Sequence, residues 1–226
     1  MLNEIFSATI NKNDKLALIK EIKANLSSSK EYYVLMITSA AMATCAILLD
    51  SIAILIASMI IAPLLQPILG ISVGFSIRDQ KITKDAINIF IRSVIYTLGI
   101  SVLFTFLFGV QGVGERFIVS FENDLFLSII VAAFSGFIAT YGMIHPKVSS
   151  SLTGIAIAVS LVPPLAAVGV GIASLDGSLI RYASGVFVVN IIGIIIASII
   201  TLILMNINEI NNELDSVAQS TPTPES

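Results

Sequence analysis

Six long stretches with almost no charge follow one another between Tyr32 and Asn206, and they limit what this chain can fold into. Each has at least the roughly 17–20 residues that a helix needs to cross a ~30 Å hydrocarbon layer. In that layer the backbone must satisfy its own hydrogen bonds, so the stretches are expected to be helical. We therefore predict an all-α, polytopic membrane protein with six transmembrane helices. Their expected ranges are 32–49, 51–77, 84–109, 124–144, 149–174 and 178–206.

The overall composition agrees with a lipid environment and excludes several kinds of chemistry. Of the 226 residues, 56% are hydrophobic and 12% are charged, whereas a soluble domain carries roughly 25% charged residues. The net charge of -3, without a basic patch, argues against a nucleic-acid partner. With only Cys45 and His145, the chain lacks the ligands for a thiolate or histidine metal site. We expect no enzyme activity, no metal and no cofactor, with the lipid bilayer as a partner.

The two ends of the chain differ from the middle. In residues 1–31 an apolar stripe at three- and four-residue spacing predicts an amphipathic segment on the cytoplasmic side. That segment lies either on the membrane surface or on the cytoplasmic face of its own protein. Residues 207–226 are acidic and polar, and they are predicted to be a disordered cytoplasmic tail. The stripe consists of Leu16, Ile19, Ile22 and Leu26.

Lysine and arginine are distributed unevenly between the two sides of the predicted topology. With the N-terminus inside, all but Arg116 and Arg181 fall on the cytoplasmic side. Because cytoplasmic segments of membrane proteins are enriched in these residues, both termini are predicted to be cytoplasmic.

A shift of 97 residues lays the second half of the chain on the first without a gap. Each half has three spans, so the halves must run through the bilayer in opposite directions. We therefore predict two inverted three-helix repeats, 32–109 and 124–206, an architecture typical of secondary transporters. The coinciding residues include Pro67 with Pro164, Gly74 with Gly171 and Asp79 with Asp176.

Proline pairs occupy the middle of spans two and five. Pro63 and Pro67 lie in the former, and Pro163 and Pro164 in the latter. Because proline removes a backbone donor and crowds the preceding turn, both spans are predicted to be broken helices. Backbone groups freed in this way bind ions or polar groups. The alternative is a plain kink packed against its neighbours, and apolar side chains covering the breaks would argue against a binding site.

Polar residues near the breaks complete the predicted site. The alternative for these polar groups is hydrogen bonding between helices. No acidic residue falls at mid-depth, which favours a neutral or anionic solute, or an ion held by carbonyl groups. Asp79 and Asp176 follow spans two and five, and they either cap the next helices or mark the mouths of a pathway. The predicted substrate-binding residues are Ser58, Pro63, Gln66, Pro67, Ser160, Pro163, Pro164 and Asn190.

Three segments resemble one known family. They are 58–70 (SMIIAPLLQPILG), 154–166 (GIAIAVSLVPPLA) and 187–190 (FVVN). They resemble the prokaryotic membrane proteins catalogued as domain of unknown function 389, over roughly residues 32–206. The resemblance implies a multi-pass protein of the prokaryotic cell (inner) membrane, and it supplies no substrate.

The leading hypothesis is a transporter that moves a small solute or ion through a site at the two broken helices. An oligomeric ion channel, in which the same breaks line a pore, is the first alternative. A non-transporting membrane scaffold or sensor is the second. The small-residue spacing of Gly70 and Gly74 allows close helix packing, and a homo-oligomer is expected.

Overall fold

A computed structural model describes residues 18–20, 22–23, 26, 30–109, 125–144 and 150–207; for 125–126, 144 and 150–160 it describes the backbone alone. All the regular structure in these ranges is helical, and the helices match the predicted spans to within four residues at each end. The helices are α3 (Lys30–Leu48), α4 (Ile52–Ile61), α5 (Leu65–Ser76), α6 (Gln80–Phe108), α8 (Leu125–Ile144), α9 (Ser150–Ser174) and α10 (Gly177–Leu204).

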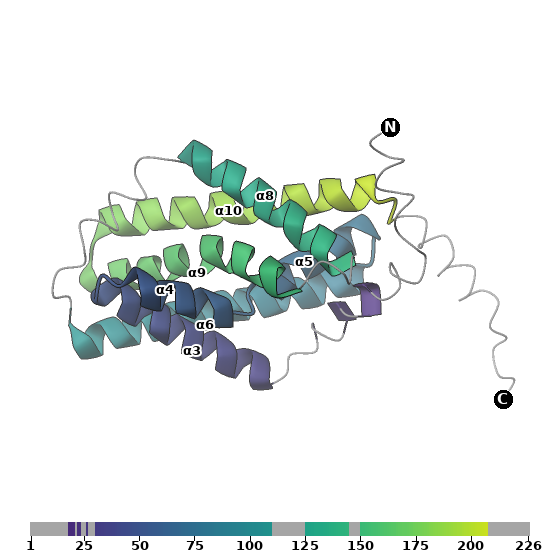
Figure 1. The fold of residues 1–226 in the computed structure, drawn as a ribbon. Coiled ribbons are helices and arrows are strands. Elements are labelled where there is room, and N and C mark those ends of the chain that lie inside the picture. The colour runs from purple at the N-terminus through teal and green to yellow at the C-terminus, as the bar shows by residue number, and fades with distance from the viewer. Residues whose placement is uncertain are drawn as a thin grey trace, which may run out of the picture.

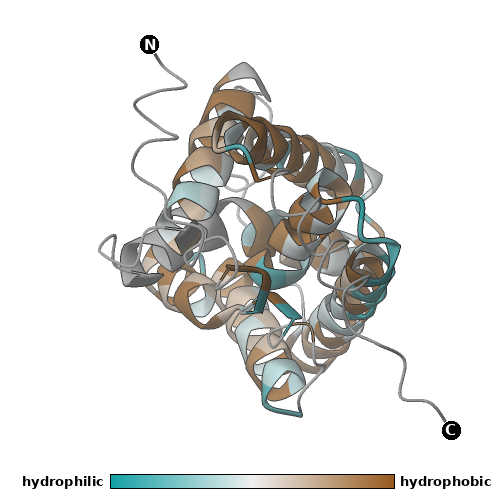
Figure 2. Cartoon of the chain, turned by 90° about the vertical axis from the view of Figure 1, so that its right-hand side faces the viewer, coloured by the Kyte–Doolittle hydropathy of each residue, from teal (hydrophilic) through white to brown (hydrophobic). Residues whose placement is uncertain are grey.

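Several of these helices have the length and surface of membrane spans. The helices α3, α6 and α10 are long and apolar enough to cross a membrane, and α4 with α5 qualifies as one bent span. Large apolar side chains point outward, among them Phe106, which is 72% exposed. Figure 2 shows apolar residues on the outside of the bundle. A surface of this kind is suited to lipid rather than water. Shorter apolar stretches, Leu127–Met143 and Leu161–Ser174, lie in α8 and α9.

The helices lie side by side in one bundle (Figure 1). In it, α6 packs against α3, α5 and α9, while α10 packs against α8, α9 and α5. The closest approach joins α8 to α10, where Gly136 faces the backbone of Ile194. There the Ser198 hydroxyl donates a hydrogen bond to the Gly136 carbonyl at 3.4 Å. Small residues at such crossings let helix backbones approach in the absence of a hydrophobic driving force.

The corner between α5 and α6 and the corner between α9 and α10 are built alike. Asp79 caps α6 by accepting the backbone N–H groups two and three residues later, at 2.9 and 3.1 Å. Asp176 caps α10 in the same way, at 3.0 and 3.1 Å. The two aspartates share an extended backbone, with φ and ψ of -85° and 100° in one and -86° and 95° in the other. Helix capping, one of the two predicted roles, is therefore confirmed.

The residues before the two caps match as well. Arg78 and Leu175 both adopt left-handed backbone, with φ of 56° and 57°. Each aspartate N–H then donates at 2.9 Å to the carbonyl of the glycine five residues earlier, Gly74 or Gly171. Figure 1 places the two corners at opposite ends of the bundle.

Because the caps match, their removal is expected to have equal effects at both corners. Asp79→Ala and Asp176→Ala should each lower the free energy of unfolding by about 1 kcal/mol, since each leaves two N–H groups without the side-chain acceptor. Thermal unfolding in detergent measures this, with the exposed, non-capping Asp85→Ala as control. A loss confined to one corner would contradict the equivalence.

Acidification should affect the α9–α10 corner. The Ser178 hydroxyl, and then the Leu179 N–H, hold the pKa of Asp176 below its ordinary value. A depressed folded-state pKa stabilises the fold above the ordinary value, and this contribution is lost as the pH falls through the folded-state pKa.

The predicted break in span five is wrong. Helix α9 runs without interruption from Ser150 to Ser174, with Pro163 and Pro164 inside it. Every residue from Leu161 to Gly171 is buried. A proline inside a helix costs about 3 kcal/mol, and packing on all sides of this stretch outweighs that cost.

The described N-terminal residues pack on the protein itself, which is one of the two predicted alternatives. Leu18, Ile19 and Ile22 are 1–5% exposed and join the end of α5, the start of α6 and the residues after α10 in one cluster. Both ends of the described chain therefore lie at the same end of the bundle (Figure 1). The tail predicted to be disordered falls, from residue 208 on, outside the described residues.

Candidate functional site

The break between α4 and α5 follows from one proline. Helix α4 ends at Ile61, and Ala62 turns to extended backbone with φ -68° and ψ 121°, the conformation that a residue before proline prefers. Pro63 has no N–H to continue the helix. Its carbonyl accepts a bond from the Gln66 N–H at 3.3 Å, where α5 begins. The two helices differ in direction by 47°, so the predicted break in span two is confirmed.

The second proline of this span is placed without cost. Pro67 is the third residue of α5, in the turn where the backbone N–H groups have no partner within the helix. It is also buried. Two prolines four residues apart thus have different roles, since Pro63 ends one helix and Pro67 lies at the start of the next.

A side chain from α3 stabilises the cut end of α4. The last four carbonyls of a helix have no partner within it. Ser39 donates its hydroxyl to the Ser58 carbonyl at 2.8 Å, and the Ser58 hydroxyl donates to the Leu55 carbonyl at 2.6 Å. Ser58, a predicted binding residue, therefore uses its hydroxyl inside α4. Ser39 was not predicted, because its role depends on how α3 lies against α4.

Apolar side chains cover the break in this conformation. Leu64, between the two helices, is 1% exposed and belongs to the same buried cluster as Leu161, Val162 and Leu165 of α9. Pro163 and Pro164 lie within that stretch and are buried. The structure thus brings the two proline pairs into neighbouring parts of one apolar core. This packing argues against a preformed polar site between them.

The polar candidates are separated from one another. Gln66 is half-buried in the first turn of α5, and Asn190 is 4% exposed in α10. Within the described part of the chain, no hydrogen bond joins Gln66 to Asn190. The side chain of Ser160 lies outside the described residues. The predicted site is therefore not a single polar cluster in this conformation.

A row of buried hydroxyls on α6 is the main polar feature that was not predicted. Tyr32 of α3 shares a hydrogen bond with Ser93 at 2.8 Å, and the Thr44 hydroxyl donates to Ser101 at 2.9 Å. Three members also donate to the carbonyl four residues earlier. The row therefore ties α3 to α6, and its four-residue spacing was the sequence signal. Its members are Ser93, Thr97, Ser101 and Thr105, each at most 1% exposed.

Metal binding finds no support in the described side chains, where no three His, Cys, Asp or Glu residues could hold an ion.

Comparisons with known proteins agree on a family without an assigned activity. A family model described as "Domain of unknown function (DUF389)" matches residues 59–196. Uncharacterized protein MJ0678 of Methanocaldococcus jannaschii is 30% identical over 204 residues, which cover 84% of this chain and 60% of that protein. The chain thus spans less than two thirds of the length of this curated relative. No solved structure matches the chain.

Proposed function

Since the chain belongs to the family described as domain of unknown function (DUF389), which names no activity, we propose a function from the site itself. We propose a membrane transporter that moves a small solute or ion past the α4–α5 break. The break is the observation that carries the proposal. It lies beside Ser39, the tenth of the 19 residues of α3, and so beside the middle of a helix long enough to span a membrane. Non-helical backbone at that depth is tolerated only where it is buried in protein or lines a cavity.

Internal symmetry supports the inverted three-helix repeats. Phe90 and Phe187 are 97 residues apart, and their rings stack with centroids at 6.3 Å and an interplanar angle of 9°. Equivalent residues of two halves meet in this way near the axis that relates them. The packing of α6 on α9 is matched by that of α10 on α5, and the matching corners lie at opposite ends. These features support six spans, with the second half reversed.

The apolar cover over the break indicates which state the structure describes. With Leu64 packed against Leu161 and Leu165, no polar solute passes, so this is the closed conformation in the proposed cycle. Transport requires α4 and α5 to move away from α9. Since neither α4 nor α5 carries a charged side chain, the proposed solute is neutral or anionic, or an ion held by backbone carbonyls.

The proposed setting is the prokaryotic cell membrane, with both termini cytoplasmic. Placing the ends at one side of the bundle fits an even number of spans. The excess of Lys and Arg in the segments assigned to that side supports the cytoplasmic assignment. Homo-oligomerisation is part of the same proposal.

Cysteine labelling tests whether the break opens to water. Cys45 is the single cysteine, so Cys45→Ala gives a background free of thiols. In it, Leu64→Cys should react with a membrane-impermeant thiol reagent about tenfold faster than Ile60→Cys, because a lipid-embedded thiol does not ionise. Ile60 is 58% exposed on the outside of α4 and serves as the matched control. Equal inertness of both cysteines would count against the proposal.

Flux measurements separate the alternatives. A transporter in proteoliposomes should give saturable uptake and counterflow for one class among ions, sugars, amino acids and organic acids. Discrete conductance steps in planar bilayers would indicate a channel instead. Absence of both kinds of flux, together with an inert Leu64→Cys, would favour the scaffold or sensor.

A further inference from the structure

The N-terminal residues dock on the parts of the protein that adjoin the break. The side chains of Leu18, Ile19 and Ile22 are buried against Val73 and Ile77 near the end of α5. The same cluster includes Ile82 at the start of α6 and three residues at the end of α10. This contact buries the apolar stripe of the amphipathic segment. The residues at the end of α10 are Leu202, Met205 and Ile207.

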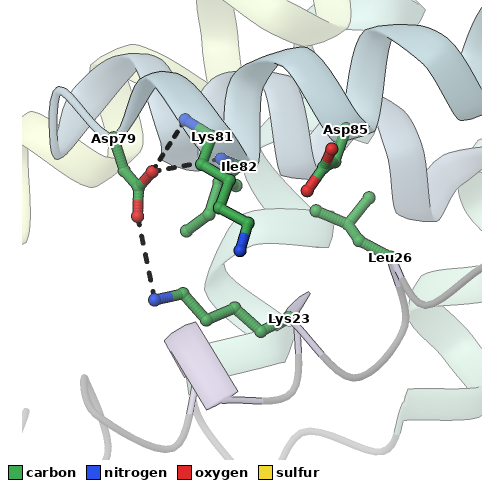
Figure 3. A pocket seen from close by; sticks show the side chains of 6 residues that line it. All are labelled: Lys23, Leu26, Asp79, Lys81, Ile82 and Asp85. Carbon is green, nitrogen blue, oxygen red and sulfur yellow. Dashed lines mark hydrogen bonds and ion pairs between the residues drawn. The ribbon is translucent and has the colours of Figure 1, made fainter.

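A polar contact fixes the position of the segment along the corner (Figure 3). Lys23 Nζ lies 3.7 Å from Asp79 Oδ2, the carboxylate whose other oxygen caps α6. Between them lies a cavity of about 300 Å³, with Lys81 and Asp85 on its wall. The side chains of Lys23 and Asp79 are 55% and 30% exposed. Water therefore screens the pair, so the apolar contacts supply most of the affinity.

The last described residue of the segment reaches α5 directly. A Cβ atom added to Gly70 would lie 3.1 and 3.2 Å from the methyl carbons of Leu26. Gly70 lies in α5, three residues after Pro67. A side chain of the N-terminal segment thus rests on the second half of the broken span.

The equivalent corner at the other end is built differently at its surface. Ile77, which the N-terminal segment covers, has Ser174 as its partner 97 residues on. The carboxylate of Asp176 accepts the hydroxyl of Ser178 at 2.5 Å, where Asp79 has Lys23. Leu175, next to it, is 90% exposed. The backbone of the corner is therefore repeated, while the apolar docking surface belongs to one corner alone.

We infer that residues 18–26 form a latch that holds the α5–α6 corner against the end of α10 and keeps the broken span closed. The inference rests on the proposed function, because it assigns a regulator to the same break. In a bundle of two matching halves, a contact present at one end only biases which end opens. Release of the latch frees α5 to move away from α9, and re-docking restores the closed state.

Two labelling positions test the latch in the full chain with Cys45→Ala. Ile77→Cys reports docking, since Ile77 is 3% exposed under the segment, and Leu64→Cys reports opening of the break. Ile22→Asp places a carboxylate in the apolar contact. It is expected to raise the labelling rate at both positions about tenfold, since local opening sets access to buried groups. Lys20→Asp, at an exposed position on the same segment, is the control and should change neither rate.

The outcomes distinguish the latch from the transport proposal. Faster labelling of Ile77→Cys with an unchanged, measurable rate at Leu64→Cys would overturn the latch and leave the transport proposal standing. A Leu64→Cys that stays inert in every background would overturn both proposals. Should Ile22→Asp fail to fold, Lys23→Gln removes only the ion pair, and a smaller rise at both positions supports the latch. No rise at either position overturns it.

Discussion

Gly136→Leu is expected to destabilise the protein by about 3 kcal/mol or more, the largest effect of any single substitution considered. A Cβ atom at this position would lie 2.5 Å from the Ile194 carbonyl oxygen and 2.9 Å from its Cα. Because these are backbone atoms, α8 and α10 must separate to make room. Their separation also breaks the bond from the Ser198 hydroxyl to the Gly136 carbonyl. The thermal midpoint in detergent, followed by the loss of monodisperse protein, measures the effect.

Gly99→Leu is the matched control. Gly99 lies in α6, and nothing lies within 4 Å of a Cβ placed there. Leucine at an exposed position of an apolar helix is compatible with lipid and favours helix, so stability should be unchanged or slightly raised. A Gly136→Leu protein as stable as Gly99→Leu would mean that α8 and α10 do not approach as described.

Pro63→Ala is expected to abolish transport while preserving the fold. Alanine restores an N–H that can continue α4 through Ala62, and it removes the steric reason for extended backbone before proline. The 47° change of direction between α4 and α5 should then decrease, and the moving element of the proposed cycle is lost. Flux is expected to fall by more than about tenfold, with a thermal midpoint equal to or above that of the parent protein.

Pro164→Ala separates this effect from the mere loss of a proline. Pro164 lies inside a helix that is already continuous, so the added N–H has no change of direction to reverse. This variant should retain flux and gain stability. If both variants lost flux equally, α9 would have to move as well, and the break in α4–α5 would not be the hinge.

The helices could be predicted from sequence because lipid leaves the backbone little choice. Long uncharged stretches of the required length must be helical, and Asp50, Asp79 and Asp176 mark where one helix gives way to the next. The break at Pro63 was predictable for the same local reason. Whether a proline interrupts its helix depends, however, on its neighbours. Pro163 and Pro164 are enclosed by packed residues, and that enclosure is a property of the folded bundle.

The functional groups were harder to predict than the helices. Ser39 acts through its depth relative to Ser58, and sequence spacing within α3 carries no information on that register. The hydroxyl row of α6 was visible as spacing, but its bonds to Tyr32 and Thr44 depend on which face α3 presents. For the amphipathic N-terminus the stripe predicted a contact, while its partner became known only from the burial of Ile77 and Ile82.

The two matching corners make this chain its own control. Asp79 and Asp176 have the same local geometry but lie at opposite ends of the bundle, within one polypeptide that shares one expression level, one detergent and one lipid composition. A pair of variants 97 residues apart therefore cancels every influence except the compartment that each corner faces. Differences in titration, labelling or proteolysis within such a pair then measure membrane sidedness directly.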